Sequence, residues 1–271
     1  MIGKGSEVVQ GLWIGRDLSL MEQLSIKSFL ANGHAVHLYV YSRINNVPSG
    51  ALIKDAREIL PQEGIFKYRR KVGAGSYSGF SNVFLYKLLS EKGGIWSDLD
   101  MVCLKPLDFD AEYVFASEDT KDGGSKICAG FIKAPRGCDF IKACYDEASR
   151  IDPRLMRWNQ SGSELLTRRI DEFRLREHVF SPKAFCPVPC WEFRKFVESD
   201  GSFSPTAETY TVHLWHEMWR REKKALTMWT RIRNRLSGVQ AMDQNIVYSP
   251  RTLYGNFQQR YLLMGSVRPG A

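Results

Sequence analysis

Several features that would assign this chain to a particular class of protein are missing from its sequence. No run of about 18 uninterrupted apolar residues is present, so we expect no membrane span. The first residues, MIGKGSEVVQGLWIG, lack the long apolar core of a signal peptide. No internal repeat, low-complexity segment or Pro/Gly/Ser-rich linker divides the chain. These absences predict one domain, residues 1–271, in the cytoplasm.

A paired disulfide framework is also missing. The six cysteines, at positions 103, 128, 138, 144, 186 and 190, show no such spacing, which is more typical of free thiols in a reducing compartment. Cys186 and Cys190 flank a Pro-Val-Pro segment, but no second close Cys or Cys/His pair completes a zinc-binding pattern. We therefore expect no structural zinc.

The composition is that of an ordinary globular protein, with 44% hydrophobic and 25% charged residues. The net charge of +8 and the pI of about 9.2 suit phosphates, nucleotides or an anionic membrane surface. Most of this charge lies between residues 213 and 236, where seven basic residues stand against two acidic ones. This segment is either a solvated helical face or a surface that docks on anionic lipid. No nucleic-acid-binding motif accompanies it, and we expect no nucleic-acid partner.

The order of hydrophobic patterns predicts an α/β fold. Residues 8–15 and 35–42 have the pattern of strands, and Ser19 and Glu22 between them have the spacing of a capping box for a helix. Strand, helix and strand within roughly 35 residues indicate a mainly parallel sheet. We expect a helix at 81–92 ending at Gly93, strands at 95–104, 112–118 and 126–134, and helices at 137–150, 161–174 and 215–236.

Asp98 and Asp100 stand one residue apart in IWSDLDMVCL, residues 95–104. If the strand continues through them, both carboxylates lie on one face and repel unless a cation, a ligand or solvent compensates them. The pair is either two solvated acids or a site for Mg²⁺ or Mn²⁺, which prefer carboxylate ligands. The string also matches Asp-x-Asp-x-Val, the nucleophile loop of haloacid-dehalogenase-type phosphatases. Those enzymes need a later Gly-Asp or Asp-Asp, and the chain contains neither.

A longer stretch carries a resemblance. SGFSNVFLYKLLSEKGGIWSDLDMVCLKPLDF resembles the core of the DXD-containing glycosyltransferases of the family 32 type, whose sugar-binding region is shared with the glucosylating clostridial toxins and the α-1,4-glycosyltransferases. LWIG at 12–15, AGFIKAPRG at 129–137, SGSELLTRRI at 161–170 and TVHLWHEMWRR at 211–221 resemble further blocks of that family in the same order. The residues at the family spacing in the core are Ser81, Asn82, Leu85, Leu89, Gly93, Gly94, Trp96, Asp98 and Asp100.

The resemblance implies a GT-A type fold: a mainly parallel, Rossmann-like central sheet flanked by helices, with a helical C-terminal part. Residues 1–135 would bind nucleotide-sugar and metal, and residues 136–271 would form the acceptor side and a metal and phosphate loop. Trp13 would stack on the base, and the Trp215 indole would donate to the leaving phosphate. The implied catalytic and metal-binding residues are Asp98, Asp100 and His213; the implied donor-binding residues are Trp13, Ile14, Gly15, Ser81, Asn82, Leu85, Gly94, Trp96, Asp98 and Trp215.

The implied function is a metal-dependent, retaining transfer of a hexose from a UDP-sugar to a saccharide or glycolipid acceptor, with Mn²⁺ or Mg²⁺, in bacterial surface polysaccharide synthesis. The enzyme would be cytoplasmic or peripheral to the inner face of the membrane, which it would contact through residues 215–236.

Ser163 stands where the family usually has Pro, and two other departures from the family pattern affect the donor site. Asn82 stands where the family has Asp, and Leu85 where it has Arg, at positions that help to hold the nucleotide. These two departures favour the alternative of a non-catalytic sugar-nucleotide-binding module. An effector that glycosylates a host protein is a further alternative. Restoring both family residues is expected to tighten UDP binding without changing the melting temperature.

Overall fold

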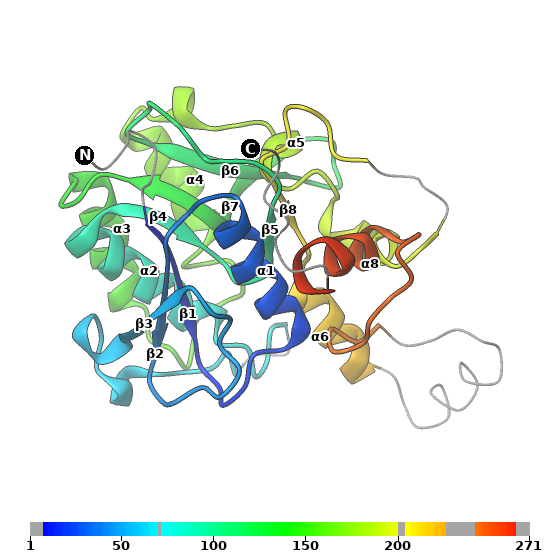
Figure 1. The fold of residues 1–271 in the computed structure, drawn as a ribbon. Helices are drawn as coiled ribbons and strands as arrows, with labels where there is room; N and C mark the ends of the chain where they lie inside the picture. Colours follow the sequence, from blue (N-terminus) through cyan, green and yellow to red (C-terminus); the bar gives the residue numbers. More distant parts are fainter. Residues whose placement is uncertain (1–7, 70–71, 200–203, 226–241, 264–271) are drawn as a thin grey trace, which may run out of the picture.

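The computed structural model describes residues 8–69, 72–199, 204–225 and 242–263. Its centre is a six-stranded sheet (Figure 1) in which four neighbouring strands run parallel, the fifth runs in the opposite direction, and the sixth pairs antiparallel with the fifth. The predicted α/β class with a mainly parallel sheet is confirmed. In spatial order the strands are β3 (Ala51–Asp55), β2 (Val36–Val40), β1 (Val9–Trp13), β4 (Gly94–Ser97), β7 (Ser125–Ala134) and β6 (Val114–Asp119).

Helices cover both faces of this sheet. Side chains alternate between the two faces along each strand, so both faces have apolar side chains for helices to pack on. Ile95 and Phe131 belong to the hydrophobic cluster on the face of α1 (Leu20–Ala31), and their neighbours Trp96 and Ile132 belong to the cluster on the other face. The second face is covered by α2 (Ser78–Lys92), α3 (Asp139–Arg150) and α4 (Ser163–Glu172).

The predicted start of α1 and the predicted end of α2 are both found in the structure. The Ser19 side chain accepts a hydrogen bond from the Met21 N–H at 3.2 Å, and Glu22 accepts one from the Ser19 N–H at 2.7 Å, which completes the predicted capping box. Helix α2 ends at Gly93, as predicted, with φ of +67°, a conformation that favours glycine.

The predicted strand over residues 95–104 is wrong as a single element. Strand β4 ends at Ser97, the chain turns, and β5 (Met101–Cys103) pairs antiparallel with β8 (Thr211–His213) in a separate two-stranded sheet. Asp98 and Asp100 therefore lie in a turn between two sheets, not on one strand face. Gly11 of β1 allows this turn, since a Cβ there would lie 2.8 Å from Cδ2 of Leu99.

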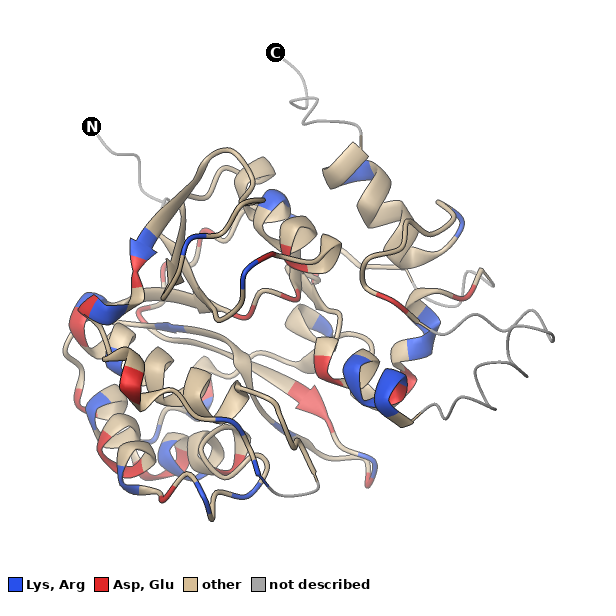
Figure 2. Cartoon of the chain, turned by 90° about the horizontal axis from the view of Figure 1, so that it is seen from below, with Lys and Arg blue, Asp and Glu red and all other residues tan. Residues whose placement is uncertain are grey.

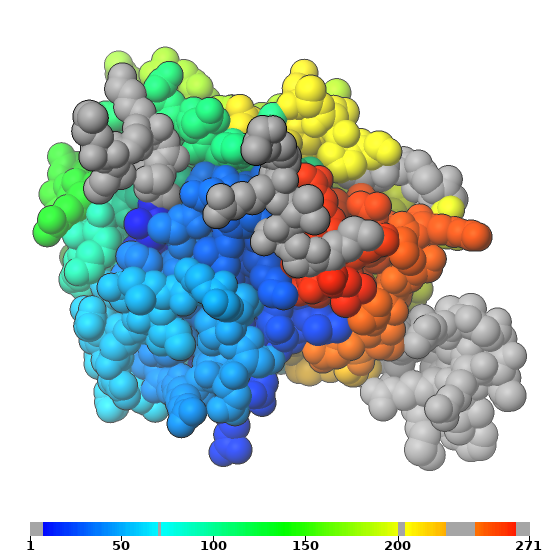
Figure 3. All heavy atoms as spheres, in the orientation of Figure 1, coloured from blue at the N-terminus to red at the C-terminus, as the bar shows by residue number. Residues whose placement is uncertain are grey.

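The C-terminal part is helical, as predicted, and its last described segment packs against the N-terminal part. Figure 3 shows the last described segment, 242–263, lying against the N-terminal elements; Tyr254, Phe257 and Tyr261 from this segment share a hydrophobic cluster with residues of α1. The remaining elements are α5 (Pro182–Phe185), α6 (His216–Ala225), α8 (Leu253–Gln258) and the short turns of helix Ala56–Glu58, Gln62–Gly64, Arg176–His178, Cys190–Phe196 and Gln259–Leu263.

The basic stretch is only partly described, and its described part is engaged within the molecule. On α6, Arg220 pairs with Glu217 at 2.6 Å, and Arg220 and Lys224 donate to the carbonyl of Ala74. Arg221 lies 4.2 Å from the ring centre of Trp158. Figure 2 shows basic and acidic residues interspersed over the helices. The basic residues at 231, 233 and 235 lie outside the described residues.

None of the described helices combines the length and the apolar composition that crossing a bilayer requires.

Candidate metal centre and active site

The candidate site lies where the order of the parallel strands reverses direction. Strand β1 has β2 on one side and β4 on the other, so the chain leaves β1 toward one edge and later returns to the opposite side. In open α/β sheets, ligands bind at this point, outside the carboxyl ends of the strands. Trp13 ends β1, and Asp98 follows the last residue of β4.

Asp98, Asp100 and His213 meet at this edge. A carboxylate oxygen of each aspartate and a ring nitrogen of His213 all lie within 4.8 Å of one another. His213 Nε2 lies 3.2 Å from Asp100 Oδ1, and their side chains are only 8% and 12% exposed. The residues come from the turn after β4 and from β8, and the pairing of Met101 with His213 brings them together.

Backbone and side-chain hydrogen bonds hold both aspartates. The Asp98 N–H donates to the carbonyl of Gly130 at 2.8 Å, and the Trp96 indole N–H donates to Asp98 Oδ1 at 3.0 Å. Asp100 Oδ2 accepts the backbone N–H of His216 at 2.8 Å, so a carboxylate faces the first residue of α6. The positive end of the helix dipole favours the ionised form there.

Three ionisable groups perturb one another in this small volume. Burial, and then the charge of Asp100, raise the pKa of Asp98 to about 7. Burial would also raise the pKa of Asp100, but the neighbouring His213 lowers it to about 2. Burial would lower the pKa of His213, but Asp100 and Cys128 raise it well above its usual value. A bound cation would compensate the charge of a second ionised carboxylate in this volume.

The donor set fits a divalent cation. Two carboxylates and one imidazole suit Mn²⁺ and Mg²⁺, with Mn²⁺ better matched to the nitrogen ligand. Gly130 keeps the space beside them clear: a Cβ there would lie 3.2 Å from His213 Cε1 and 3.5 Å from Asp98 Oδ2. Sequence reasoning did not single out Gly130; its only signal is a glycine inside an apolar strand, which often marks close approach of a ligand.

The predicted base-stacking segment lies at the end of the neighbouring strand. Trp13 is half-buried, and its indole N–H is enclosed without a hydrogen-bond partner among the described residues. Gly15 is exposed, and a Cβ there would lie 2.9 Å from that indole nitrogen. Ile14 is half-buried against the cluster on the α2 side of the sheet. A buried, unpaired donor beside an exposed glycine is suited to receive an acceptor from a ligand.

The predicted donor-binding residues of α2 divide into two kinds. Ser81 and Asn82 are half-buried, and Asn82 Nδ2 donates to Ser161 Oγ at 3.3 Å. Leu85 is only 1% exposed and packs in the hydrophobic cluster with Leu88 and its neighbours. The structure therefore removes Leu85 from the donor-binding residues, because its side chain cannot reach a ligand.

Three further predictions need correction. Gly94 begins β4, so it lies at the opposite end of that strand from Asp98. Trp96 is 1% exposed, and its indole N–H is bonded to Asp98, so it orients a carboxylate and does not contact a donor. The Trp215 indole N–H donates to the Val188 carbonyl at 2.8 Å and not toward a phosphate. Trp215 stacks on His213 with ring centres 3.8 Å apart.

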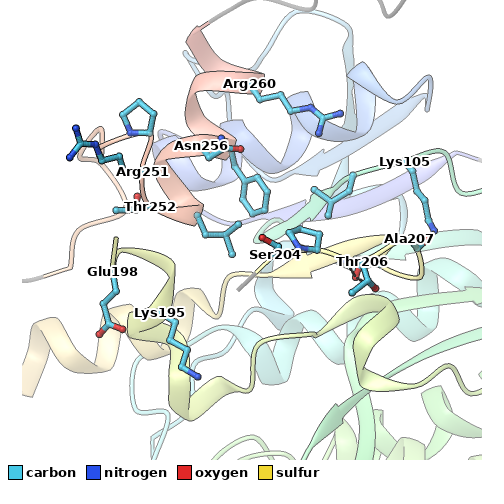
Figure 4. Close-up of a pocket in the computed structure, with 16 residues that line it drawn as sticks. Lys105, Lys195, Glu198, Ser204, Thr206, Ala207, Arg251, Thr252, Asn256 and Arg260 are labelled. Atoms are coloured by element: carbon cyan, nitrogen blue, oxygen red, sulfur yellow. Dashed lines mark hydrogen bonds between the residues drawn. The ribbon is translucent and has the colours of Figure 1, made fainter. Parts of the chain in front are cut away.

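A cavity of about 540 Å³ lies elsewhere, at the far end of β5 (Figure 4). Lys105, Arg251 and Arg260 are among its lining residues, whereas Asp98, Asp100 and His213 are not. The cavity is therefore separate from the candidate metal centre.

No family model matches the chain. Among solved structures it is similar to one titled PaToxG glycosyltransferase, with 12% sequence identity and a TM-score of 0.45 over 94% of this chain and 86% of that chain. It is also similar to a mutant of a transferase, with 9% identity and a TM-score of 0.36 over 63% of this chain and 85% of that chain. These likenesses are too distant to support a function, and the family 32 resemblance stays a prediction.

The charge balance of the site gives a test that requires no substrate. Asp98 keeps its proton in the folded state up to about pH 7, so the metal-free protein loses stability as the pH rises from its unfolded pKa through that value. Asp98→Asn removes this cost. We expect the variant to melt about 2–6 °C above the wild type at pH 8 and by a clearly smaller margin at pH 5, by scanning calorimetry with chelator.

Mn²⁺ should raise the melting temperature of the wild type but not that of Asp98→Asn. Asp110→Asn, at an exposed carboxylate, is the control. A difference in melting temperature that is the same at both pH values would contradict the assignment of the buried proton to Asp98.

Proposed function

We propose that this chain is a metal-dependent glycosyltransferase that uses a nucleotide-sugar donor. The observation that supports the proposal is the group Asp98, Asp100 and His213 at the carboxyl edge of the sheet, beside the unpaired indole N–H of Trp13. Two carboxylates and an imidazole provide a cation site, and the buried indole provides a place for a polar, flat ligand.

In this proposal Asp98 and Asp100 hold Mn²⁺ or Mg²⁺, with His213 as the third protein ligand. When bound, the cation neutralises charge that develops on the diphosphate as the sugar leaves. The protein residues have separate tasks. Trp96 orients Asp98, the start of α6 keeps Asp100 ionised, and Trp215 holds the imidazole plane.

The finer proposals follow the family resemblance. The donor is a UDP-hexose, the acceptor is a hydroxyl of a saccharide or glycolipid, and the anomeric configuration is retained. The acceptor hydroxyl attacks the anomeric carbon from the face on which the phosphate leaves, so no side-chain nucleophile is needed. The departing phosphate accepts the proton of that hydroxyl, so no side-chain base is needed. We place the reaction in bacterial surface polysaccharide synthesis.

A non-catalytic sugar-nucleotide-binding module is the second candidate, and one observation favours it. Leu85, where the family has an arginine, is buried in the core, so that position offers the nucleotide no cation. A hydrogen bond to a charged group contributes about 1.5–3 kcal/mol. Weaker donor binding is therefore expected from this chain than from a family 32 enzyme that keeps the arginine.

One experiment separates the two candidates. A panel of nucleotide sugars is screened by thermal shift with and without Mn²⁺, and each stabilising donor is then tested for slow hydrolysis. The enzyme should release free sugar in a cation-dependent manner. The module should bind without turnover. Stabilisation by no member of the panel would count against both.

The role of His213 has its own expected result. His213→Ala should lower donor hydrolysis about 10- to 100-fold, or raise the Mn²⁺ concentration needed by the same factor, because the site loses a ligand. The measurement is a Mn²⁺ titration of the hydrolysis rate. His37→Ala, at a histidine of β2 outside the site, is the matched control. An unchanged titration in His213→Ala would assign this histidine a structural role only.

A further inference from the structure

His213 has a second set of neighbours on the ring edge that faces away from Asp100. Its Nδ1 lies 3.6 Å from Cys128 Sγ and 3.8 Å from Cys186 Sγ, whereas its Nε2 faces Asp100. The two sulfurs and a ring nitrogen all lie within 4.8 Å of one another. Both cysteines are buried, at 3% and 0% exposure, so they are not surface thiols.

These separations match those between three of the four ligands of a tetrahedral metal site. A tetrahedral Zn²⁺ ion lies about 2.3 Å from sulfur and about 2.05 Å from nitrogen, which places sulfur and nitrogen about 3.6 Å apart. The observed 3.6 and 3.8 Å match this edge length. Cys128 comes from β7, Cys186 directly follows α5, and His213 ends β8, so three packed elements fix the geometry.

The surroundings support ligands of this kind. The Gly130 N–H donates to Cys128 Sγ at 3.4 Å, a contact that stabilises a sulfur carrying negative charge. Asp100 Oδ1 faces the other ring nitrogen of His213 at 3.2 Å, which is the carboxylate–histidine arrangement found behind zinc ligands. Trp215 stacks on the ring and fixes its plane.

We propose that Cys128, Cys186 and His213 form a site for one soft divalent cation such as Zn²⁺, and that its occupation removes His213 from the Asp98–Asp100 site. Each thiol that becomes a ligand releases its proton to solvent, and the ion binds the lone pair of Nδ1. Thiolates prefer Zn²⁺, whereas carboxylates suit Mn²⁺ and Mg²⁺, so the two sites differ in selectivity.

The competition follows from the chemistry of one imidazole. A neutral ring has a lone pair on one nitrogen and a proton on the other. With an ion at Nδ1, Nε2 carries the proton and donates to Asp100. With an ion at Nε2, Nδ1 carries it and faces Cys128. The inhibitory part of this inference rests on the proposed function, whereas the binding part does not.

Binding is tested with Co²⁺ as the probe, on the full chain kept reduced with a phosphine. A thiolate-to-cobalt charge-transfer band should grow to one equivalent of Co²⁺ and disappear when one equivalent of Zn²⁺ is added. Cys128→Ser and Cys186→Ala, measured separately, should each weaken Co²⁺ binding at least tenfold. Cys144→Ala, at another buried cysteine, should keep the band, and so should Asp98→Asn.

The wild-type spectrum decides the proposal even if a cysteine variant does not fold. Absence of the band from the folded, reduced wild type would overturn the site, and so would a band of full size in folded Cys186→Ala. Asp98→Asn separates this result from the proposed function, because it removes the other site while leaving the thiolate signal.

Inhibition is tested by donor hydrolysis in excess Mn²⁺. One equivalent of Zn²⁺ should reduce the wild-type rate at least tenfold and leave the rate of Cys186→Ala within about twofold of its value without Zn²⁺. Equal inhibition of both proteins would place the inhibitory Zn²⁺ at the aspartates and overturn the competition. If neither protein hydrolyses a donor, the cobalt spectrum still decides whether the thiolate site exists.

Discussion

Asp100→Asn should lower Mn²⁺-dependent hydrolysis of a UDP-sugar by about 10²- to 10³-fold. Asparagine keeps the size of the side chain and an oxygen that can accept the His216 N–H, so the start of α6 should remain in place. What disappears is the negative charge that faces both His213 and the proposed cation. The measurement is the initial rate of sugar release over a Mn²⁺ series, with a chelator blank.

Two controls accompany this variant. Asp110→Asn, at an exposed carboxylate of the same chain, should leave the rate unchanged. Circular dichroism and the melting temperature should show that Asp100→Asn is folded. A wild-type rate that persists in excess chelator would mean that hydrolysis needs no cation and that the aspartates have another role.

Leu85→Arg should reduce the free energy of unfolding by about 3–5 kcal/mol, the cost of an uncompensated charge in a core. Leu85 is 1% exposed and packs among apolar residues of α2 and the sheet. This corrects the expectation that restoring the family arginine leaves the melting temperature unchanged. Urea unfolding measures the loss, and Leu85→Met, which conserves volume, should cost less than about 1.5 kcal/mol.

UDP binding is the second readout for the same variant. Because the side chain at position 85 points into the core, Leu85→Arg should not tighten UDP binding in Mn²⁺ by calorimetry, whether alone or with Asn82→Asp. A stable Leu85→Arg protein with tighter UDP binding would contradict this, and would mean that the arginine escapes from the core toward the nucleotide.

The parts of the fold that could be predicted are those set by neighbours in the sequence. The capping box at Ser19 and Glu22 and the Gly93 cap depend on residues within one turn of the helix that they bound. The break at Asp98 could not be predicted, because apolar residues continue on both sides of it. Only the pairing of Met101 with His213, more than a hundred positions away, shows that β5 belongs to another sheet.

Some residues of the candidate site could likewise be predicted from neighbouring residues in the sequence, and others could not. Asp98 and Asp100 are visible as a local motif, and His213 was found only through its resemblance to a family block. Cys128 cannot be connected with Cys186 from the sequence, because zinc patterns are recognised by closely spaced cysteines and these two lie far apart in the chain. The donor-binding role of Leu85 is predicted from spacing along a helix, which identifies a family position without showing which side of this helix faces the core.

The pairing of β5 with β8 has a consequence for how the site forms. One short antiparallel ladder joins the aspartates to the histidine, and the segment between them, which includes β6, β7 and several helices, must bring its two ends together before that ladder can form. A cation bound to both ends would act as a cross-link that only the folded chain can make. We therefore expect cation binding at the candidate site and docking of β8 to be coupled, so that local detachment of β8 would take the site apart without unfolding the central sheet.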